Sequence, residues 1–491
     1  MGNLLAYHAE RDPTRVAVHF QDDAITYGDL DRWANRLARA YADRGVGFGD
    51  LVTIALPNGI EFYAAAFAAY KLGAIPQPLP NRLPRPERDA LIDLGEPALV
   101  VGVEPDESRG RASVPRGFEP PPDTLDTPVA APVGPSFKAM ASGGSTGRPK
   151  LIVAKVPAEF DPETPAVQMQ PGDVQLVPGP LYHNGPYSFS MFDLFVGGTL
   201  VVMERFDAAE ALRLVEQYRV QWVFFVPTMM HRIWRLPDRE QYDVSSLRMV
   251  FSTGAPWPVW LKEAWIEWLG PDVIREGYGG TESQGGTSIT GHESLERPGS
   301  VGLVQQGAGL RILDPDGKEV PTGEVGEIYF MPATGPGTTY YYLGAEAKDQ
   351  GGWETIGDLG YVDADGYLYL VDRRTDMIVT GGANVYPAEV EAAIDAHPGV
   401  RSSAVIGLPD DDRGASVHAI LDVPELDLAD ATAVEQFTDE LRDSLRERIV
   451  TYKVPRSFEF VSEPLRDDAG KVRRSALRDE RVPTVDAGGP A

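Results

Sequence analysis

The most informative stretch of the sequence reads Ser142-Gly143-Gly144-Ser145-Thr146-Gly147-Arg148-Pro149-Lys150. Its three glycines allow backbone N–H groups to turn toward an anion, and its hydroxyls and two cations add further donors. The stretch lacks the Gly-Lys-Ser/Thr ending of a Walker A loop and the glycine spacing of a Rossmann turn. We interpret it as a phosphate-binding loop, with a flexible Gly/Ser hairpin as the alternative.

Upstream of this loop, short apolar runs alternate with segments of helical apolar spacing. The pattern predicts strands at 24–27, 51–56 and 98–103 and helices at 29–44 and 61–72. Such alternation is typical of a parallel sheet flanked by helices. A proline-rich segment, 115–135, follows and predicts a surface connection, because proline cannot donate to a sheet ladder and resists helix.

Downstream of the loop, the pattern changes to short strands with Gly and Asp turns between Gly317 and Leu370, which indicates an antiparallel β subdomain. A helix at 388–396, strands around Val405 and His418, and a helix at 433–448 then predict a compact α+β unit. We therefore expect an α/β chain with a large N-terminal domain of mixed parallel sheets with flanking helices, residues 1–372, and a smaller α+β C-terminal domain, residues 373–491.

Composition excludes several classes of partner. The net charge of −28 repels phosphate backbones and anionic lipid, so we expect neither a nucleic-acid nor a membrane partner. Apolar runs such as 194–203 are too short to span a bilayer, and we expect a cytoplasmic enzyme. Cysteine is absent, so a thioester made here must take its sulfur from another molecule.

A second motif, Tyr278-Gly279-Gly280-Thr281-Glu282, combines an aromatic face, two residues without side chains, a hydroxyl and a carboxylate. These groups suit a stacked base, a phosphate and Mg²⁺, which prefers hard carboxylate oxygens. The alternative is a turn with a surface glutamate.

Together the motifs resemble the adenylate-forming superfamily of acyl-CoA synthetases, luciferases and peptide-synthetase adenylation domains, and are most similar to the acyl-CoA ligases. The resemblance covers essentially the whole chain. It is carried, in order, by the glycine-rich loop, Tyr278 to Glu282, Gly357-Asp358, Asp372-Arg373 and Gly470-Lys471.

The resemblance implies a site for ATP and Mg²⁺. Tyr278 would stack on adenine, Thr281 would bind the α-phosphate and Glu282 would hold the metal ion. Asp358 would accept hydrogen bonds from the ribose hydroxyls, supported by Arg373. The remaining ATP-binding residues would be Ser142, Gly143, Gly144, Ser145, Thr146, Gly147, Lys150, Gly254, Ala255 and Pro256.

Lys471 would be the catalytic cation that bridges the carboxylate and the α-phosphate in the transition state. The alternative is a solvated lysine in a turn. The family's C-terminal domain is mobile and turns about a hinge just after the position of Arg373, here Arg374-Thr375-Asp376. Gly381 and Gly382 would then help to shape the channel for the acyl acceptor.

The acid-binding residues are indicated by Pro180 to Tyr187, which resembles the stretch that lines the acyl pocket in acyl-CoA ligases. Tyr182 and His183 are candidates to line or gate this pocket, although a lone histidine is often only packed or exposed. The aromatic residues that follow predict core positions, and any that face the cavity would favour a bulky, apolar or aromatic acid.

Asp193 interrupts the apolar helix predicted after His183. It lies either on the wet face of the helix or in the acceptor channel, where it would bind or deprotonate an amine. We therefore expect a ligase that activates a hydrophobic or aromatic small-molecule carboxylic acid to acyl-AMP and transfers the acyl group to CoA. The alternatives are an amide bond synthetase that uses an amine, a luciferase-like oxygenase and an inactive nucleotide sensor.

Overall fold

The computed structural model describes residues 1–143, 149–305, 307–373, 375–380, 383–410, 413–466 and 470–482. The chain divides into two compact units. The first consists of residues 1–254, 263–310 and 330–354, and the second of residues 255–262, 311–329 and 355–491. The domain boundary predicted near Arg373 lies within the second unit and stays a prediction.

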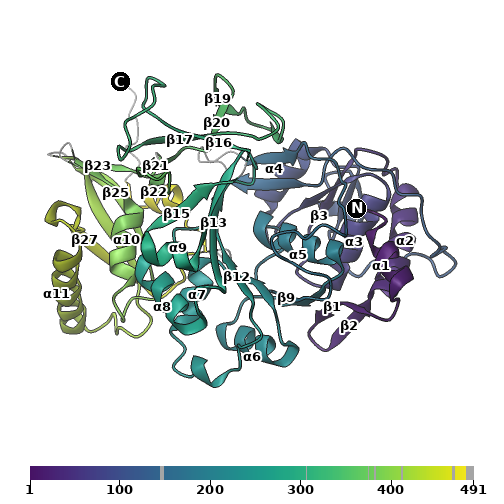
Figure 1. Ribbon diagram of the computed structural model, residues 1–491, viewed down its shortest axis with the longest axis horizontal. Helices are drawn as coiled ribbons and strands as arrows, with labels where there is room; N and C mark the ends of the chain where they lie inside the picture. The colour runs from purple at the N-terminus through teal and green to yellow at the C-terminus, as the bar shows by residue number, and fades with distance from the viewer. Residues whose placement is uncertain are drawn as a thin grey trace, which may run out of the picture. The chain divides into compact units, whose positions relative to one another are not determined.

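The first unit contains the predicted alternation of strands and helices (Figure 1). Its early elements are α1 (Leu4–Arg11), β1 (Val16–Phe20), β2 (Asp23–Thr26), α2 (Tyr27–Ala42), β3 (Leu51–Ile54), α3 (Ile60–Lys71), β4 (Ile75–Pro78), α4 (Arg85–Gly95), β5 (Leu99–Val101) and β6 (Ala112–Val114). The strands and helices predicted from residues 24 to 103 are therefore confirmed. The segment 115–135 contains no helix or strand, as its prolines predict.

Two parallel sheets form the centre of the first unit. One has the order β4-β3-β5-β6. In the other, β13, β12, β11, β9, β10 and β1 form a parallel series, which is flanked by the antiparallel strand β2 beside β1 and by the antiparallel strand β14 beside β13, and β14 pairs in turn with β15. The strands of this larger sheet that lie after β8 in the chain, and the helices between them, are β9 (Val174–Val177), α5 (Asn184–Val196), β10 (Thr199–Val202), α6 (Ala208–Tyr218), β11 (Trp222–Phe224), α7 (Pro227–Trp234), β12 (Met249–Ser252), α8 (Val259–Leu269), β13 (Ile274–Gly279), β14 (Gly286–Thr290), α9 (Gly291–Glu296) and β15 (Ser300–Val304).

Helix α3 explains how the two sheets share one core. It contacts β1 of the larger sheet and both β3 and β4 of the smaller one. Every residue from Phe62 to Lys71 is buried, so this helix is apolar on all sides. Its buried cation, Lys71 Nζ, is paired with Asp31 at 2.7 Å, which satisfies the rule that a buried charge needs a partner.

A third, antiparallel sheet in the first unit has the order β18-β8-β7, with β7 (Ala139–Gly143), β8 (Pro149–Ala154) and β18 (Tyr340–Leu343). Two short strands, β19 (Lys348–Gln350) and β20 (Trp353–Thr355), follow it along the chain. The short strands expected between Gly317 and Leu370 are present, and β17 (Gly326–Met331), β21 (Asp358–Val362) and β22 (Leu368–Arg373) pair antiparallel as predicted.

The second unit has its own hydrophobic core, which includes Val390, Ile394, Val405, Val417 and Leu441. Strand β25 (Ser402–Asp410) pairs antiparallel with β26 (Gly414–Asp422), which pairs parallel with β27 (Ser457–Val461). Its other elements are β23 (Ile378–Thr380), β24 (Ala383–Val385), α10 (Pro387–Asp395), α11 (Ala431–Arg448) and α12 (Arg474–Asp479). The predicted helices at 388–396 and 433–448 and the α+β character are confirmed.

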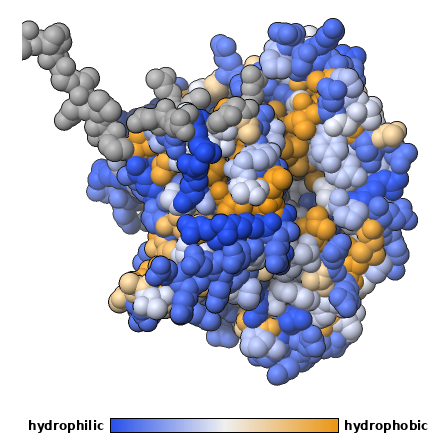
Figure 2. All heavy atoms as spheres, turned by 90° about the vertical axis from the view of Figure 1, so that its left-hand side faces the viewer, coloured by the Kyte–Doolittle hydropathy of each residue, from blue (hydrophilic) through white to orange (hydrophobic). Residues whose placement is uncertain are grey.

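Charged residues make up 24% of the chain, and their effect is visible at the surface. Hydrophilic residues cover most of the face drawn in Figure 2, with hydrophobic residues in smaller patches between them. None of the described helices is both long enough and apolar enough to cross a membrane. The cytoplasmic location expected from the sequence stays a prediction.

Candidate active site

The glycine-rich stretch lies on a β-hairpin. Strands β7 and β8 place Ser142 opposite Lys150 and Gly143 opposite Pro149. The connecting residues Gly144, Ser145, Thr146, Gly147 and Arg148 lie outside the described residues. The hairpin therefore fixes the two ends of the predicted phosphate loop, with a hydroxyl on one strand and a cation on the other.

The second motif occupies the end of β13 and the turn that leads into β14. Tyr278 pairs with Thr287 and Gly279 with Gly286. A Cβ atom at Gly286 would lie 2.7 Å from the carbonyl oxygen of Tyr278, so this position excludes a larger residue. Gly280, Thr281 and Glu282 follow in the turn, which closes with a hydrogen bond from Ser283 N to Gly280 O at 3.1 Å.

Glu282, in the second motif, contacts Lys150 of the first motif. Its side chain is 92% buried, and its Oε1 atom lies 3.5 Å from Lys150 Nζ. The Tyr342 hydroxyl donates to the same oxygen at 2.6 Å. Lys150 Nζ also lies 4.0 Å from the centre of the Tyr342 ring. Strand β18 brings Tyr342 beside β8, where it pairs with Ile152, so the contact depends on the third sheet.

These residues fit a magnesium ion of the kind held by a nucleotide. Mg²⁺ is commonly bound by one or two carboxylates together with substrate phosphates and water. The described residues contain no cluster of three or more His, Asp or Glu side chains suited to a metal ion, so an all-protein cage is absent from them. Glu282 supplies one buried hard oxygen donor group beside the cation Lys150. Both of these donors, Lys150 Nζ and the Tyr342 hydroxyl, approach Oε1.

The predicted adenine-binding residues belong to separate segments. The ring of Tyr278 is partly buried, and its centre lies 6.1 Å from the Phe330 ring at an interplanar angle of 41°. Gly254 follows β12 and has φ +90°, a conformation that favours glycine. Ala255 and Pro256 belong to the second unit.

The predicted ribose pair, Asp358 and Arg373, lies at the ends of two paired strands. The register of β21 and β22 places the two residues directly opposite each other. Arg373 Nε lies 3.2 Å from Asp358 Oδ1. The carboxylate is mostly buried and the guanidinium is exposed, so the arginine orients the carboxylate while keeping donors available.

Lys471 follows a turn at Gly470, where φ is +76°. Its side chain is exposed. The Gly470 carbonyl accepts a hydrogen bond from Arg466 Nη1 at 3.2 Å, so the backbone beside the lysine is held from within the second unit. Gly381, Gly382 and Arg374 of the predicted acceptor channel and hinge lie outside the described residues.

The predicted acid-binding stretch leads into α5. His183 precedes the first residue of this helix, and its ring centre lies 4.6 Å from that of Tyr182. The loop before it is held by Asn58, which sequence reasoning missed. Asn58 Nδ2 donates to Gly179 O at 2.9 Å, and its Oδ1 accepts from Leu181 N at 2.9 Å.

The aromatic residues around α5 form the predicted core. Phe195, Trp222 and Phe225 are almost fully buried. Phe189 is only partly buried, and its ring lies between 5.2 and 5.3 Å from the rings of Trp222, Phe224 and Phe251. This environment is apolar and aromatic.

Asp193 is placed differently from the commoner expectation. It does not lie on a wet face of α5, because its exposed fraction is 0%. Neither carboxyl oxygen has a hydrogen-bond partner among the described residues. Burial, reinforced by the charge of Asp173, raises the pKa of this carboxyl well above its usual value. The carboxyl also packs on Gly198, where a Cβ atom would lie 2.1 Å from Asp193 Oδ2. These contacts give it a place in the core.

Lys138, a second buried charge near α5, was also missed by sequence reasoning. Its Nζ donates to Ser188 Oγ at 2.5 Å and to Asn184 Oδ1. Burial lowers the pKa of this amine from 10.5 to about 7. A signal was available, because Lys138 directly precedes an apolar strand where a lysine is unusual.

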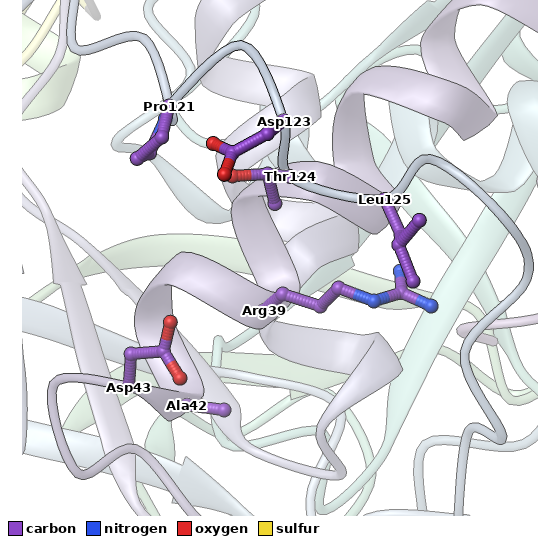
Figure 3. Close-up of a pocket in the computed structure, with 7 residues that line it drawn as sticks. All are labelled: Arg39, Ala42, Asp43, Pro121, Asp123, Thr124 and Leu125. Carbon is purple, nitrogen blue, oxygen red and sulfur yellow. The ribbon is translucent and has the colours of Figure 1, made fainter.

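A surface pocket of about 440 Å³ lies between α2 and the proline-rich segment (Figure 3). The residues that line it from α2 and its C-terminal end are Arg39, Ala42 and Asp43, and those that line it from the proline-rich segment are Pro121, Asp123, Thr124 and Leu125. It contains none of the predicted site residues. Two aspartates in its wall make it unsuitable for a nucleotide phosphate.

Each unit contains residues of the kind that an adenylate-forming enzyme uses: the hairpin and the buried carboxylate of Glu282 in the first unit, and the paired Asp358 and Arg373 in the second. The chain belongs to this class by descent as well. The AMP-binding enzyme family matches residues 5–343, and the AMP-binding enzyme C-terminal domain matches residues 389–471.

Individual relatives agree with this assignment. The chain is 35% identical to a feruloyl-CoA synthase from Amycolatopsis sp, over 97% of this chain and 98% of the relative. It resembles the solved structure of o-succinylbenzoate CoA synthetase from Bacillus subtilis in complex with its acyl-adenylate intermediate, with a TM-score of 0.79, 26% identity and 98% coverage of both chains. It also resembles the amide bond synthetase McbA from Marinactinospora thermotolerans, with a TM-score of 0.78, 25% identity and coverage of 98% of this chain and 100% of that one.

Proposed function

We propose that this protein is an ATP-dependent ligase that activates a bulky, hydrophobic or aromatic carboxylic acid as acyl-AMP and then transfers the acyl group to CoA. The observation that carries the proposal is the contact of Lys150 with the buried carboxylate of Glu282, held by Tyr342. It joins the two sequence motifs that serve ATP in the family. The 35% identity to a feruloyl-CoA synthase supports both the aromatic acid and the CoA acceptor.

In the first step, a carboxylate oxygen of the acid attacks the α-phosphorus of ATP, and the bond to pyrophosphate breaks. Lys150 neutralises the phosphates that depart as pyrophosphate. Glu282 would hold Mg²⁺, which when bound would reduce the repulsion between the anions. Asp358 accepts hydrogen bonds from the ribose hydroxyls, with Arg373 keeping its carboxylate oriented. Lys471 supplies the cation that stabilises the charge developing around the α-phosphorus.

In the second step, the thiol sulfur of CoA attacks the acyl carbonyl carbon, and the bond to AMP breaks. The protein has no cysteine to serve as an intermediate carrier, so the acyl group passes directly from AMP to the acceptor. Tyr182 and His183 directly precede α5, in a loop that Asn58 holds through Leu181 N, and Phe189 of α5 packs against Phe224. We assign the acid to this aromatic region.

The proposal is tested by incubating the protein with ATP, Mg²⁺ and a panel of hydroxycinnamic, benzoic and fatty acids, with either CoA or amines. We expect pyrophosphate release and acyl-CoA with aromatic acids, both detected by mass spectrometry. Absence of acyl-AMP across the panel would contradict the adenylation step. Amide without thioester would establish the second candidate, an amide bond synthetase, which the likeness to McbA favours.

A further inference from the structure

A buried ion network in the second unit includes an arginine on each side of Lys471 in the sequence. Its centre is Glu391 on α10, which is only 5% exposed. Arg474 reaches this carboxylate through Nε at 3.1 Å and Nη2 at 2.8 Å. Arg466 Nη2 reaches it at 3.0 Å. One carboxylate thus binds two arginines that lie on either side of Lys471 in the sequence.

The arginine on the N-terminal side also holds the backbone next to the lysine. Arg466 Nη1 donates to the carbonyl oxygen of Gly470 at 3.2 Å, and Arg466 Nη2 donates to the carbonyl oxygen of Ser403 at 3.0 Å. Gly470 is buried and has φ +76°, so its conformation is a specific one. The direction in which the chain leaves this turn sets where the exposed Lys471 side chain begins.

The arginine on the C-terminal side connects the same segment to the residues after Arg373. Arg474 Nη1 donates to Asp376 Oδ2 at 2.8 Å. Glu391 is itself fixed to the edge strand β25, because its Oε1 accepts from Val405 N at 2.8 Å. Two arginines and two carboxylates balance in charge, and every contact uses a charged donor or acceptor, the stronger class of hydrogen bond.

We propose that Glu391 is a positioning residue for Lys471. By binding Arg466 and Arg474, Glu391 fixes the chain on both sides of Lys471. The ammonium group of Lys471 is thereby kept in the position that adenylation requires. The inference rests on the proposed function, because it needs Lys471 as the cation of the first step. A bridging cation must be placed accurately, since small displacements of a catalytic group cost large factors in rate.

The test is a double-mutant cycle on adenylation. Glu391→Gln keeps the size of the side chain and removes its charge. We expect it to lower kcat for pyrophosphate exchange about 10- to 100-fold, with the KM for ATP and acid nearly unchanged. Thioester formation from supplied acyl-AMP should change by less than about threefold. In a Lys471→Ala background, Glu391→Gln should cause no additional loss, because the group that it positions is gone.

Asp422→Asn is the matched control. Asp422 is a buried carboxylate of the same unit, 1% exposed, which binds Arg401 through two contacts of 2.6 and 2.8 Å but does not touch the lysine segment. It should lower the melting temperature without changing the ratio of the two half-reactions. If Glu391→Gln yields no folded protein, Arg466→Lys, which keeps the charge but loses the reach to Gly470, takes its place in the cycle.

The following outcomes decide whether Glu391 positions Lys471. Selective loss of adenylation that disappears in the Lys471→Ala background supports the proposal. Equal loss in both half-reactions, or a loss that adds to that of Lys471→Ala, overturns it and makes Glu391 a structural residue only. Unchanged adenylation in Lys471→Ala alone overturns the role of Lys471 in the proposed function, and with it any role for Glu391 through that lysine.

Discussion

The Tyr342 hydroxyl donates a hydrogen bond of 2.6 Å to Glu282 Oε1. Burial and the adjacent carboxylate raise the pKa of Tyr342 above its usual value, so the hydroxyl stays protonated and remains a donor throughout the working pH range. This hydrogen bond fixes the orientation of the Glu282 carboxylate for binding a metal ion, as the hydrogen-bond partners of metal ligands do in other proteins.

Tyr342→Phe should therefore raise the Mg²⁺ concentration needed for half-maximal adenylation, by about 10-fold. The reason is that Glu282 loses the donor that fixes Oε1, while the ring under Lys150 is kept. The measurement is a Mg²⁺ titration of pyrophosphate exchange at saturating ATP. Tyr341→Phe is the control, because Tyr341 is 42% exposed and alternates to the other face of β18. An unchanged titration curve in Tyr342→Phe would show that the tyrosine does not serve the metal ion.

Lys471→Ala should lower the rate of acyl-AMP formation about 100- to 1000-fold. Transfer from supplied acyl-AMP to the acceptor should be affected much less, because the cation is needed chiefly in the first transition state. Both half-reactions are followed separately, by pyrophosphate exchange and by consumption of acyl-AMP. An equal loss in the two would identify Lys471 as a structural residue.

The fold was largely predictable because its signals are local. The apolar spacing of residues 29–44 and the Asp-Gly turns near residues 317 and 366 depend on neighbours along the chain, and helices and strands follow from them. These elements sufficed to predict the α/β class and the α+β second unit.

The missed contacts of the site depend on distant parts of the chain. Tyr342 reaches Glu282 across 60 residues, and Arg466 reaches Glu391 across 75. No local pattern distinguishes Tyr342 from Tyr341 as a functional residue, because neighbouring side chains of β18 point to opposite faces of its sheet and only the tertiary structure determines which face lies toward Glu282. Asp193 was ambiguous for a related reason. Helix α5 is apolar nearly all round, so its sequence does not define a wet face.

Lys138→Met should change the pH dependence of stability. The folded protein binds the Lys138 proton only below about pH 7, whereas the unfolded chain binds it up to about pH 10.5. Between these values the unfolded state holds more protons, so the contribution of this lysine becomes more favourable to the fold as pH rises. Below pH 7 the buried charge carries its full desolvation cost.

The variant should accordingly gain stability relative to wild type at pH 6, and the gain should shrink by about 3 kcal/mol by pH 9. Ser188 and Asn184 can satisfy each other, since Ser188 Oγ already lies 3.2 Å from Asn184 Oδ1. The measurement is urea unfolding at a series of pH values, with Lys155→Met, an exposed site, as the control. A pH-independent difference between Lys138→Met and wild type would contradict the lowered pKa.

Asp193→Asn separates a structural carboxyl from one that serves the acceptor. Asp193 is fully buried, so we expect the ratio of thioester to amide, and the rate of each half-reaction, to stay within about twofold of wild type.

The pKa of Asp193 is raised in the folded state, so the folded protein keeps the proton that the unfolded chain releases above about pH 4. Wild-type stability therefore falls as pH rises above that value, and the asparagine variant lacks this loss. The free energy of unfolding of the variant minus that of wild type should increase by at least about 1 kcal/mol between pH 4 and pH 7. Unfolding curves at the two pH values and product analysis with CoA and amines give both readouts. Slower amide formation with intact adenylation would instead place Asp193 in the acceptor channel and make an amine the natural acceptor.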